Sequence, residues 1–259
     1  MRYFLFLFLL STLSYSQSGK IIYSSIFNFT GNVNEYKSDL YFAKNISFYQ
    51  KQMDAGEKSN REQKSTEDED GRLVEINITV GSDSIGDVYY YNLRNPNIVV
   101  TRNAIYKNNK PNYFVFKDST NIKWQLHEEY KEISGYSCQK ASTTFRGRHY
   151  EAWFTSKIPL SFGPWKFNDL PGLILEIYDQ TGQVYFGVEH IQIPYVDAEQ
   201  HILELSDPII GHREFIEKSN QLPDNIRKMI ETRRPKNAIS KPLVVKKHSL
   251  ELEYEWEKE

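Results

Sequence analysis

Two arginines that lie two positions apart, Arg146 and Arg148, are the residues of this chain whose type and spacing best suit anion binding. Alternate residues of a β-strand point to the same face, so both guanidinium groups would lie side by side if no bulge intervenes at Gly147. Two adjacent guanidinium groups can hold a carboxylate or a phosphate through paired hydrogen bonds. The alternative is an internal role, in which the arginines pair with strand glutamates such as Glu176.

An aromatic residue and a lysine follow soon after the arginine pair. Trp165 and Lys166 lie in Gly163-Pro164-Trp165-Lys166, which is predicted to be a loop, and Trp165 is expected to make an exposed contact there. Trp153, in contrast, is expected to pack in the core. The predicted ligand- or partner-binding surface consists of four residues: Arg146, Arg148, Trp165 and Lys166.

Side chains typical of metal and redox sites occur here without the spacing that such sites need. The six histidines show no short spacing around Cys138, the single cysteine, so we assign no metal site and no cofactor. One cysteine excludes an intramolecular disulfide. Cys138 is expected to be a small buried residue within a strand, and the alternative is a metal-binding or redox thiol. Residues 67–71 resemble a calcium loop only superficially, because the glutamate expected at its twelfth position is missing.

Motifs that would identify an enzyme are absent from the sequence. It contains no nucleophile elbow, zinc-binding helix, phosphate-binding loop or dinucleotide fingerprint. We therefore assign no catalytic residue and expect a binding protein rather than an enzyme.

Strands are the elements that would position these side chains, from residue 21 to about residue 193. The chain contains 18 Tyr and 15 Phe against 13 Gly and 10 Pro, a composition that suits pleated, half-buried surfaces. Strand-type segments recur every ten to fifteen residues or so with turn residues between them, which favours an antiparallel meander. The expected strands cover residues 21–29, 39–49, 73–80, 87–93, 97–106, 113–117, 136–145 and 148–154. The predicted fold class is mainly β: a single curved antiparallel sheet or a partly open barrel, with one or two short C-terminal helices.

The segment from Asp169 to Ile174 predicts a turn that begins a hairpin. Proline fixes φ at about −65° and glycine accepts a positive φ, which are the requirements of the two central positions of a type II turn. The alternating apolar residues after the turn predict one strand, and residues 183–188 predict the returning strand. Turn chemistry and core packing explain every residue type of the motif, so five residues are assigned a structural role: Leu170, Pro171, Gly172, Leu173 and Ile174.

The segments 135–141 and 145–177 resemble the signature of the GLPGLI family, exported proteins of Bacteroidota whose name spells the motif found here at residues 169–174. The family pattern has glycine where this chain has Asp169, a residue type that tolerates a left-handed backbone. The resemblance covers about residues 124–188. It implies an accessory protein encoded beside TonB-dependent outer-membrane transporters, and hence such a transporter or another envelope protein as partner. It implies no particular reaction.

The N-terminus has the pattern of a secretory signal peptide over residues 1–16. Arg2 precedes an apolar run over residues 3–10, and Ser14-Tyr15-Ser16 supplies small residues for cleavage. The run is shorter than the ~18 residues that a membrane-spanning helix needs, so we expect the mature chain, residues 17–259, to be exported and not to span a membrane. Loss of Arg2 changes the formal net charge from −2 to −3, a balance that disfavours nucleic-acid binding.

Four further segments complete the predicted single domain. Residues 54–71 are charged and are interpreted as a polar loop or an insertion. Residues 214–220 and 224–233 are predicted to form short helices. Residues 249–257, in which glutamates alternate with apolar residues, are predicted to form a final half-buried strand.

The function predicted from these observations is that of an exported binding or accessory protein of the cell envelope, without catalytic activity. One alternative is a periplasmic carrier that holds a hydrophobic cargo in a β-sheet cradle, and a less expected one is an envelope hydrolase. The sequence leaves open the ligand, the oligomeric state, and whether the protein resides in the periplasm or beyond the outer membrane.

Overall fold

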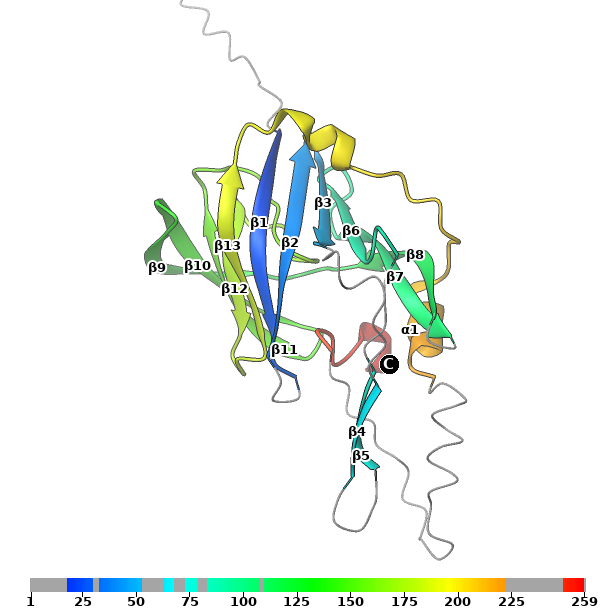
Figure 1. Ribbon diagram of the computed structural model, residues 1–259. Coiled ribbons are helices and arrows are strands. Elements are labelled where there is room, and N and C mark those ends of the chain that lie inside the picture. The colour runs from blue at the N-terminus through cyan, green and yellow to red at the C-terminus, as the bar shows by residue number, and fades with distance from the viewer. Residues whose placement is uncertain are drawn as a thin grey trace, which may run out of the picture.

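The computed structural model describes residues 18–29, 33–52, 63–67, 73–78, 83–107, 110–221 and 249–258. Its strands are β1 (Ser18–Phe27), β2 (Asn34–Ala43), β3 (Ile46–Lys51), β4 (Gln63–Glu67), β5 (Leu73–Ile78), β6 (Val88–Asn92), β7 (Ile98–Lys107), β8 (Lys110–Ser119), β9 (Gln125–Ile133), β10 (Tyr136–Phe145), β11 (Arg148–Thr155), β12 (Leu173–Asp179) and β13 (Val184–Gln192). Its helices are the 3₁₀ segments η1 (Val196–His201) and η2 (Glu255–Glu257) and the α-helix α1 (His212–Ser219). Eleven strands form one antiparallel sheet in the order β8-β7-β6-β3-β2-β1-β13-β12-β11-β10-β9, while β4 and β5 pair separately (Figure 1). The predicted fold class is confirmed: the protein is mainly β, and the sheet is not closed into a barrel.

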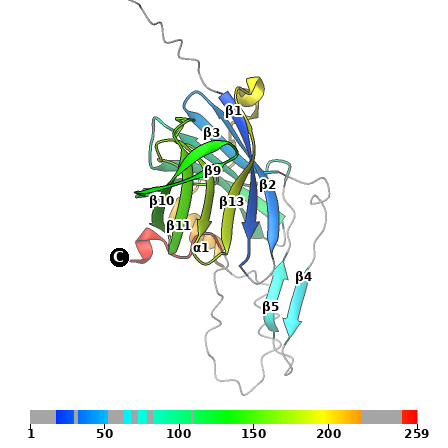
Figure 2. The same ribbon diagram turned by 90° about the vertical axis from the view of Figure 1, so that its left-hand side faces the viewer.

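The sheet must curl because a short connection joins its two outer strands. If the sheet were flat, ten spacings of about 4.8 Å would separate β8 from β9 by roughly 48 Å. The chain passes from Ser119, the last residue of β8, to Gln125, the first of β9, in six Cα–Cα steps, which reach about 23 Å at most. Figures 1 and 2 accordingly show the strands at both margins turned out of the plane of the central strands β1, β2 and β13. The curl brings residues at the end of β8 near the β10–β11 turn.

The loop between β11 and β12, residues 156–172, contributes to the main hydrophobic core. Its apolar side chains lie in the same buried cluster as the inward-facing residues of β1, β2, β11 and β12. Those loop residues are Ile158, Leu160, Phe162, Trp165, Phe167 and Leu170. The single residue Phe167 makes edge-to-face contacts with Phe145 of β10, Tyr150 of β11 and Phe186 of β13. A segment without regular secondary structure thus packs against several strands.

The hairpin predicted after the motif is confirmed by the pairing of β12 with β13. The predicted type II turn is wrong, because the residue with positive φ is Asp169, at 68°, and not Gly172. The amide of Gly172 instead donates to the carbonyl of Leu170 at 2.7 Å, a three-residue γ-turn around Pro171. Asp169 thus adopts a left-handed backbone conformation, which aspartate tolerates.

Close packing explains the glycine of the motif. A Cβ atom on Gly172 would lie 2.2 Å from the carbonyl oxygen of Thr155, the last residue of β11. Real Cβ atoms do not approach a backbone oxygen so closely, so only glycine fits beside this strand end. The motif is thus a tight crossing of the chain over β11, followed by the start of β12.

Several other predictions can be compared with the described residues. Residues 39–49 form parts of two strands, β2 and β3, because the chain turns at Lys44, where φ is 56°. The segment 54–71 contains β4, and the rest of it, with the calcium-like residues 68–71, lies outside the described residues. Helix α1 confirms the prediction for residues 214–220. The predicted helix over 224–233 and the signal peptide lie outside the described residues.

The predicted strand over residues 249–257 is wrong. This segment bends and ends in the single turn η2. Its alternating side chains contact groups that do not belong to a neighbouring, paired strand. No helix in the described part of the chain is long and apolar enough to cross a membrane.

Candidate functional site

Arg146 occupies a tight turn rather than a strand face. It forms the two-residue connection between β10 and β11 with Gly147, and φ is 46° at Arg146 and 83° at Gly147. Positive φ at both central residues is the requirement of a type I′ hairpin turn. The prediction that Arg146 and Arg148 lie on one strand face is therefore wrong, and the two guanidinium groups bind different carboxylates.

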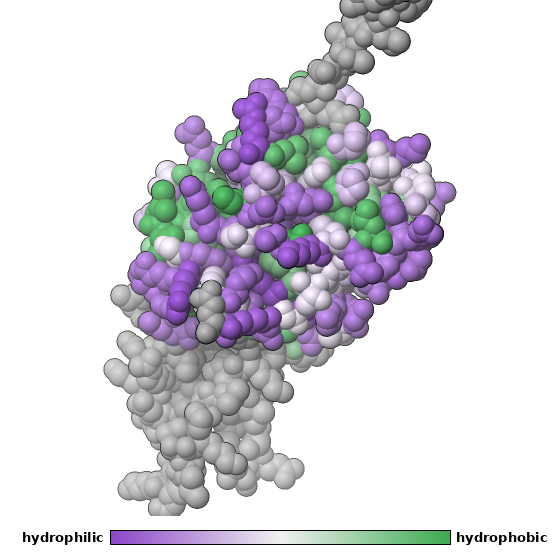
Figure 3. Space-filling model, turned by 180° about the vertical axis from the view of Figure 1, so that it is seen from behind, coloured by the Kyte–Doolittle hydropathy of each residue, from purple (hydrophilic) through white to green (hydrophobic). Residues whose placement is uncertain are grey.

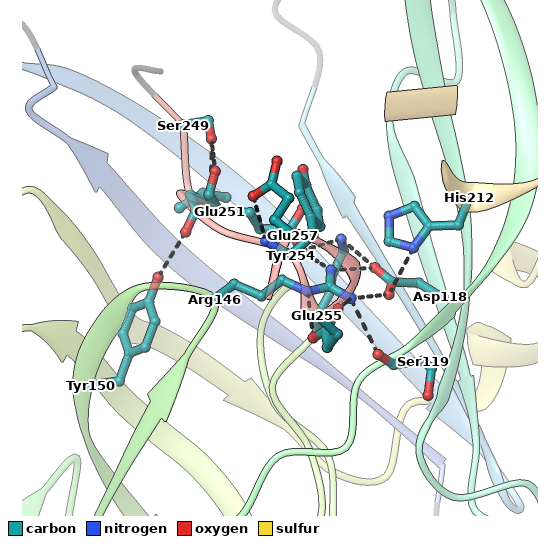
Figure 4. Close-up of polar contacts among 12 residues, drawn as sticks. Asp118, Ser119, Arg146, Tyr150, His212, Ser249, Glu251, Tyr254, Glu255 and Glu257 are labelled. Carbon is teal, nitrogen blue, oxygen red and sulfur yellow. Dashed lines mark hydrogen bonds and ion pairs between the residues drawn. The ribbon is translucent and has the colours of Figure 1, made fainter. Parts of the chain in front are cut away.

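Four charged side chains meet beside this turn: Asp118 from the end of β8, Arg146, Lys166 from the 156–172 loop and Glu251 from the C-terminal segment. Two guanidinium nitrogens of Arg146 donate to the Asp118 carboxylate, at 2.5 and 2.9 Å, and a third contact joins Arg146 to Glu251 (Figure 4). Lys166 Nζ lies 2.5 Å from Asp118 Oδ2 and 2.7 Å from Glu251 Oε1. The four formal charges cancel, and we call this group the ionic cluster.

The cluster is dry. The side chains of Arg146 and Lys166 are each 2% exposed and that of Asp118 is 0% exposed. Burial on its own would raise the pKa of Asp118, but the positive charges of Lys166 and Arg146 outweigh it and hold that pKa well below its usual range. Asp118 is thus an ionised carboxylate kept in the interior by two cations.

His212, the first residue of α1, borders the cluster. Its ring stacks on Phe116 with ring centroids 4.8 Å apart, and its Nδ1 lies 3.4 Å from Asp118 Oδ1. Burial lowers the pKa of His212, and the negative charge of Asp118 offsets this only in part because Lys166 and Arg146 repel a further proton. His212 is therefore a neutral neighbour of the cluster at pH 7.

The C-terminal segment, residues 249–257, lies against the cluster without strand pairing. The amide of Leu252 donates to the carbonyl of Arg146 at 2.9 Å, and the hydroxyl of Tyr150 donates to the carbonyl of Leu250 at 3.2 Å. Glu255 adds a contact with Nε of Arg146 at 3.2 Å. Figure 4 shows this segment passing beside the Arg146 side chain, opposite Asp118 and His212.

Arg148 binds the same segment from a second position. Its Nη1 donates to the buried carboxylate of Asp179 at 2.7 Å, and its Nη2 donates to the carbonyl of Ser249 at 2.8 Å. The internal alternative named Glu176 as an example of a partner, but Glu176 pairs with Lys131 at 2.6 Å instead. Arg148 thus joins the β12–β13 turn to the start of the C-terminal segment.

Trp165 does not make the exposed contact that was expected of it. The residue is 6% exposed, and its ring packs edge-on against Phe145 and Phe167 with centroids 6.0 and 5.2 Å away. Its φ of 55° turns the chain sharply, so that Trp165 enters the core while the next residue, Lys166, reaches the ionic cluster. An aromatic residue within an apolar loop gains more from burial than from exposure.

The structure thus brings together three of the four predicted site residues, around carboxylates of the chain itself. Arg146, Lys166 and Arg148 all contact the C-terminal segment, while Trp165 supports Lys166 from the core. Sequence reasoning missed Asp118, His212 and Glu251. The only available signal was the acidic alternation around Glu251, which was interpreted as the polar face of a strand.

Cys138 is fully buried in β10, which confirms the structural interpretation of this residue, and burial raises the pKa of its thiol to about 11. In the part of the chain that the structure describes, no three His, Cys, Asp or Glu side chains form a group that could hold a metal ion.

Comparison with known proteins adds a partial family match and a fold. The family described as "Protein of unknown function (Porph_ging)" matches residues 146–176, the stretch from the Arg146 turn to the middle of β12. No curated protein matches the chain. Two crystal structures of PNGF-II, in space groups C2 and P21, are similar at 16% sequence identity with TM-scores of 0.53 and 0.51. They cover 79% and 78% of this chain but only 33% of PNGF-II, so the chain spans about a third of the length of that protein. At this identity the likeness shows the fold alone.

Proposed function

We propose that this chain is an exported, non-catalytic binding protein of the cell envelope, a member of the GLPGLI family that acts with a TonB-dependent outer-membrane transporter or another envelope protein. The signature over residues 135–141 and 145–177 supports the family. The pattern of residues 1–16 supports export. The fold also occurs as one third of a longer protein, which suits a module that works by contact with other domains.

The observation that carries the binding role is the outer edge of β9. Among the described residues no strand pairs with this edge. The opposite edge, β8, is partly covered, because Val115 forms a parallel bridge with Ile209. On β9, Leu126 and Tyr130 are 49% and 63% exposed. An uncovered strand with exposed apolar side chains is a surface to which a second chain can add.

The chemistry of β9 selects the kind of partner. Glu128, Glu129 and Glu132 are exposed on this strand, so it favours an extended segment that carries lysine or arginine beside an apolar residue. The pairing of β9 with β10 is irregular between Gln139 and Ala141. Bulges and charges on an edge strand limit indiscriminate pairing, so a partner must match the side chains as well as the backbone.

The ionic cluster supports the absence of catalysis. A catalytic acid or base needs access to a substrate and a pKa suited to proton transfer. Asp118 and Lys166 are buried and paired with each other, and the pKa of Asp118 is held far from neutrality. In this arrangement the charges of Asp118 and Lys166 face other charged groups of the chain and no substrate.

The carrier alternative has less support. A carrier of hydrophobic cargo needs an apolar cavity of several hundred cubic ångströms or so. The apolar side chains of the 156–172 loop pack into the main core. The face of the molecule seen in Figure 3 is largely hydrophilic, with hydrophobic side chains in small separate patches. Such a surface suits a limited protein contact.

The proposal is tested by recovering the tagged mature protein from envelopes of the producing organism and quantifying co-purified outer-membrane transporters. The charge-reversal variant Glu128→Lys/Glu132→Lys is expected to lose the transporter. The matched control Glu214→Lys/Glu217→Lys changes the charge equally on the exposed face of α1 and is expected to keep it.

Two results would overturn the proposal. One is recovery of the same transporter with both variants, or recovery of no transporter with either variant or with the original chain. The other is turnover of envelope peptides, glycans or esters by the purified protein, abolished by a single substitution in the ionic cluster that leaves the thermal stability unchanged.

A further inference from the structure

The three basic residues that the sequence marked for ligand binding already hold a ligand, the C-terminal segment of their own chain. Arg146 and Lys166 contact the Glu251 carboxylate, and Arg148 binds the carbonyl of Ser249. The contacts come from two parts of the fold that lie far from the segment in sequence, since Arg146 and Glu251 are 105 positions apart. The segment is held as a separate peptide would be.

The surface that holds the segment, called the groove below, is formed by Arg146, Arg148, Lys166, Asp118 and His212. Its charge balance shows which occupant it requires. Without Glu251, the buried groups are Arg146, Lys166 and Asp118, two cations and one anion. A buried, uncompensated charge is costly, so the groove favours an occupant that supplies one carboxylate at this position. Asp118 belongs to β8 and remains in place whatever the occupant.

The aromatic end of the segment has its own contacts. Tyr254 and Trp256 stack with ring centroids 4.8 Å apart, and both rings meet the edge or face of His212 at 5.7 and 5.0 Å. Tyr254 lies in a second hydrophobic cluster with Phe116 and Phe215, separate from the main core. The groove therefore recognises a carboxylate and, three residues later, an aromatic ring.

The backbone contacts of the segment are few. Two of its amides, those of Leu252 and Glu253, donate to the single carbonyl of Arg146 at 2.9 and 3.3 Å. Among the strands that the structure describes, none pairs with the segment. A ladder would make the segment part of the sheet, whereas side-chain recognition permits replacement by another peptide with the same groups.

We propose that this groove is a binding site for acidic, aromatic peptides of the pattern Glu-x-x-Tyr-x-Trp, occupied within the chain by residues 249–257. A competing peptide of this kind displaces the segment and takes over the contacts to Arg146 and Lys166. A free peptide must compete with the tethered segment, whose effective concentration at the groove is in the millimolar range or so. The site is distinct from the β9 edge and does not depend on the function proposed for it.

The proposal is tested with the full mature chain carrying a specific protease site between residues 222 and 248. The chain is cut after purification, and a fluorescent synthetic peptide of residues 249–259 is added. Cutting removes the tether advantage, so the cut protein is expected to bind the labelled peptide about 100-fold or more tightly than the uncut protein does. Binding is measured by fluorescence anisotropy, and the fold by circular dichroism.

Two peptide variants define the chemistry. The Glu251→Gln peptide loses a charge-assisted contact to two cations and is expected to bind about 10- to 100-fold more weakly. The Glu253→Gln peptide is the control, since Glu253 pairs only with Lys258 of the same segment among the ion pairs of the described residues, and it is expected to bind as the original does. The proposal is wrong if the two variants bind equally, if the cut protein takes up no labelled peptide within a day, or if cutting unfolds the protein.

Discussion

Replacement of Arg146 by methionine is the sharpest test of the ionic cluster. Methionine retains an apolar stem but has no group to bind Asp118 or Glu251, both of which contact Arg146. The Asp118 side chain is 0% exposed, so water cannot replace the lost partner. Removing one partner of a buried ion pair costs about 3–5 kcal/mol of unfolding free energy, and we expect Arg146→Met to fall in this range.

The assay is urea unfolding of the mature protein at pH 7, followed by fluorescence. The control is Arg213→Met on α1, where the arginine is 64% exposed and pairs with Glu217 at 3.0 Å. Exposed pairs of this kind contribute about 0.3–0.5 kcal/mol. A loss for Arg146→Met as small as that of the control would refute the buried cluster.

A double-mutant cycle tests whether the stability of the ionic cluster depends on the balance of its four charges. Asp118→Leu alone leaves two cations with Glu251, while Arg146→Met alone leaves two carboxylates with Lys166. The double variant leaves one cation and one carboxylate, a neutral pair. We therefore expect the double variant to be more stable than the sum of the single losses by about 2 kcal/mol or more. Additive losses would contradict the reasoning.

Three further predictions follow from burial and backbone geometry. Gly172→Ala places a Cβ 2.2 Å from the carbonyl oxygen of Thr155 and is expected to lower the free energy of unfolding by about 1–3 kcal/mol, measured by thermal unfolding. The control is Pro171→Ala at the exposed neighbouring position, which is expected to cost less than about 1 kcal/mol. Equal losses would contradict the close-packing argument. Burial lowers the pKa of His212 in the folded protein below its ordinary 6.5. As the pH falls, the unfolded protein therefore binds a proton at this histidine before the folded protein does. The stability that neutral His212 contributes is present above pH 6.5 and is lost as the pH falls through the lowered pKa. His212→Phe keeps the ring stack and should flatten the change in urea midpoint between pH 7 and pH 5; an unchanged slope would count against this. Cys138, with its thiol pKa raised by burial to about 11, should resist a thiol reagent at pH 8 in the folded protein and react fully in guanidinium, and rapid labelling of the folded protein would show that it is accessible.

Local patterns predicted the strands well where each strand has one buried face. The strands predicted over 136–145 and 148–154 agree closely with β10 and β11, because apolar and polar residues alternate there and turn residues bound the segments. The turn between them could also have been found. A two-residue gap that ends in Gly147, between two alternating segments, is a hairpin signal, and it would have removed Arg146 from the strand face.

The C-terminal segment shows where such patterns fail. Leu252, Tyr254 and Trp256 alternate with glutamates as in a half-buried strand. The segment nevertheless contacts a turn through Leu252, a loop through Glu251, and a helix through its two aromatic rings. Alternation shows that one face is buried and does not show what buries it. The partners of Glu251 depend on the curl of the whole sheet, which brings β8 and the β10–β11 turn together.

The exposed contact predicted for Trp165 is wrong for a related reason. A loop position usually indicates exposure, but the 156–172 loop is rich in apolar residues and packs into the core. The count of apolar residues in the loop, rather than the absence of strand periodicity, was the informative signal. The ligand- or partner-binding role predicted for Arg146, Arg148 and Lys166 stays a prediction. In the structure they pair with carboxylates of the chain itself, which lie too far away in sequence to be found from local patterns.

Hydrogen exchange of the segment 249–258 tests most directly whether Glu251 anchors this segment to the groove. In the original protein the amides of Leu252 and Glu253, which donate to the Arg146 carbonyl, should be protected. In Glu251→Gln they should exchange rapidly while the amides of β12 keep their protection, and Glu253→Gln should behave as the original. Rapid exchange of the segment in the original protein, or unchanged protection in Glu251→Gln, would contradict the account.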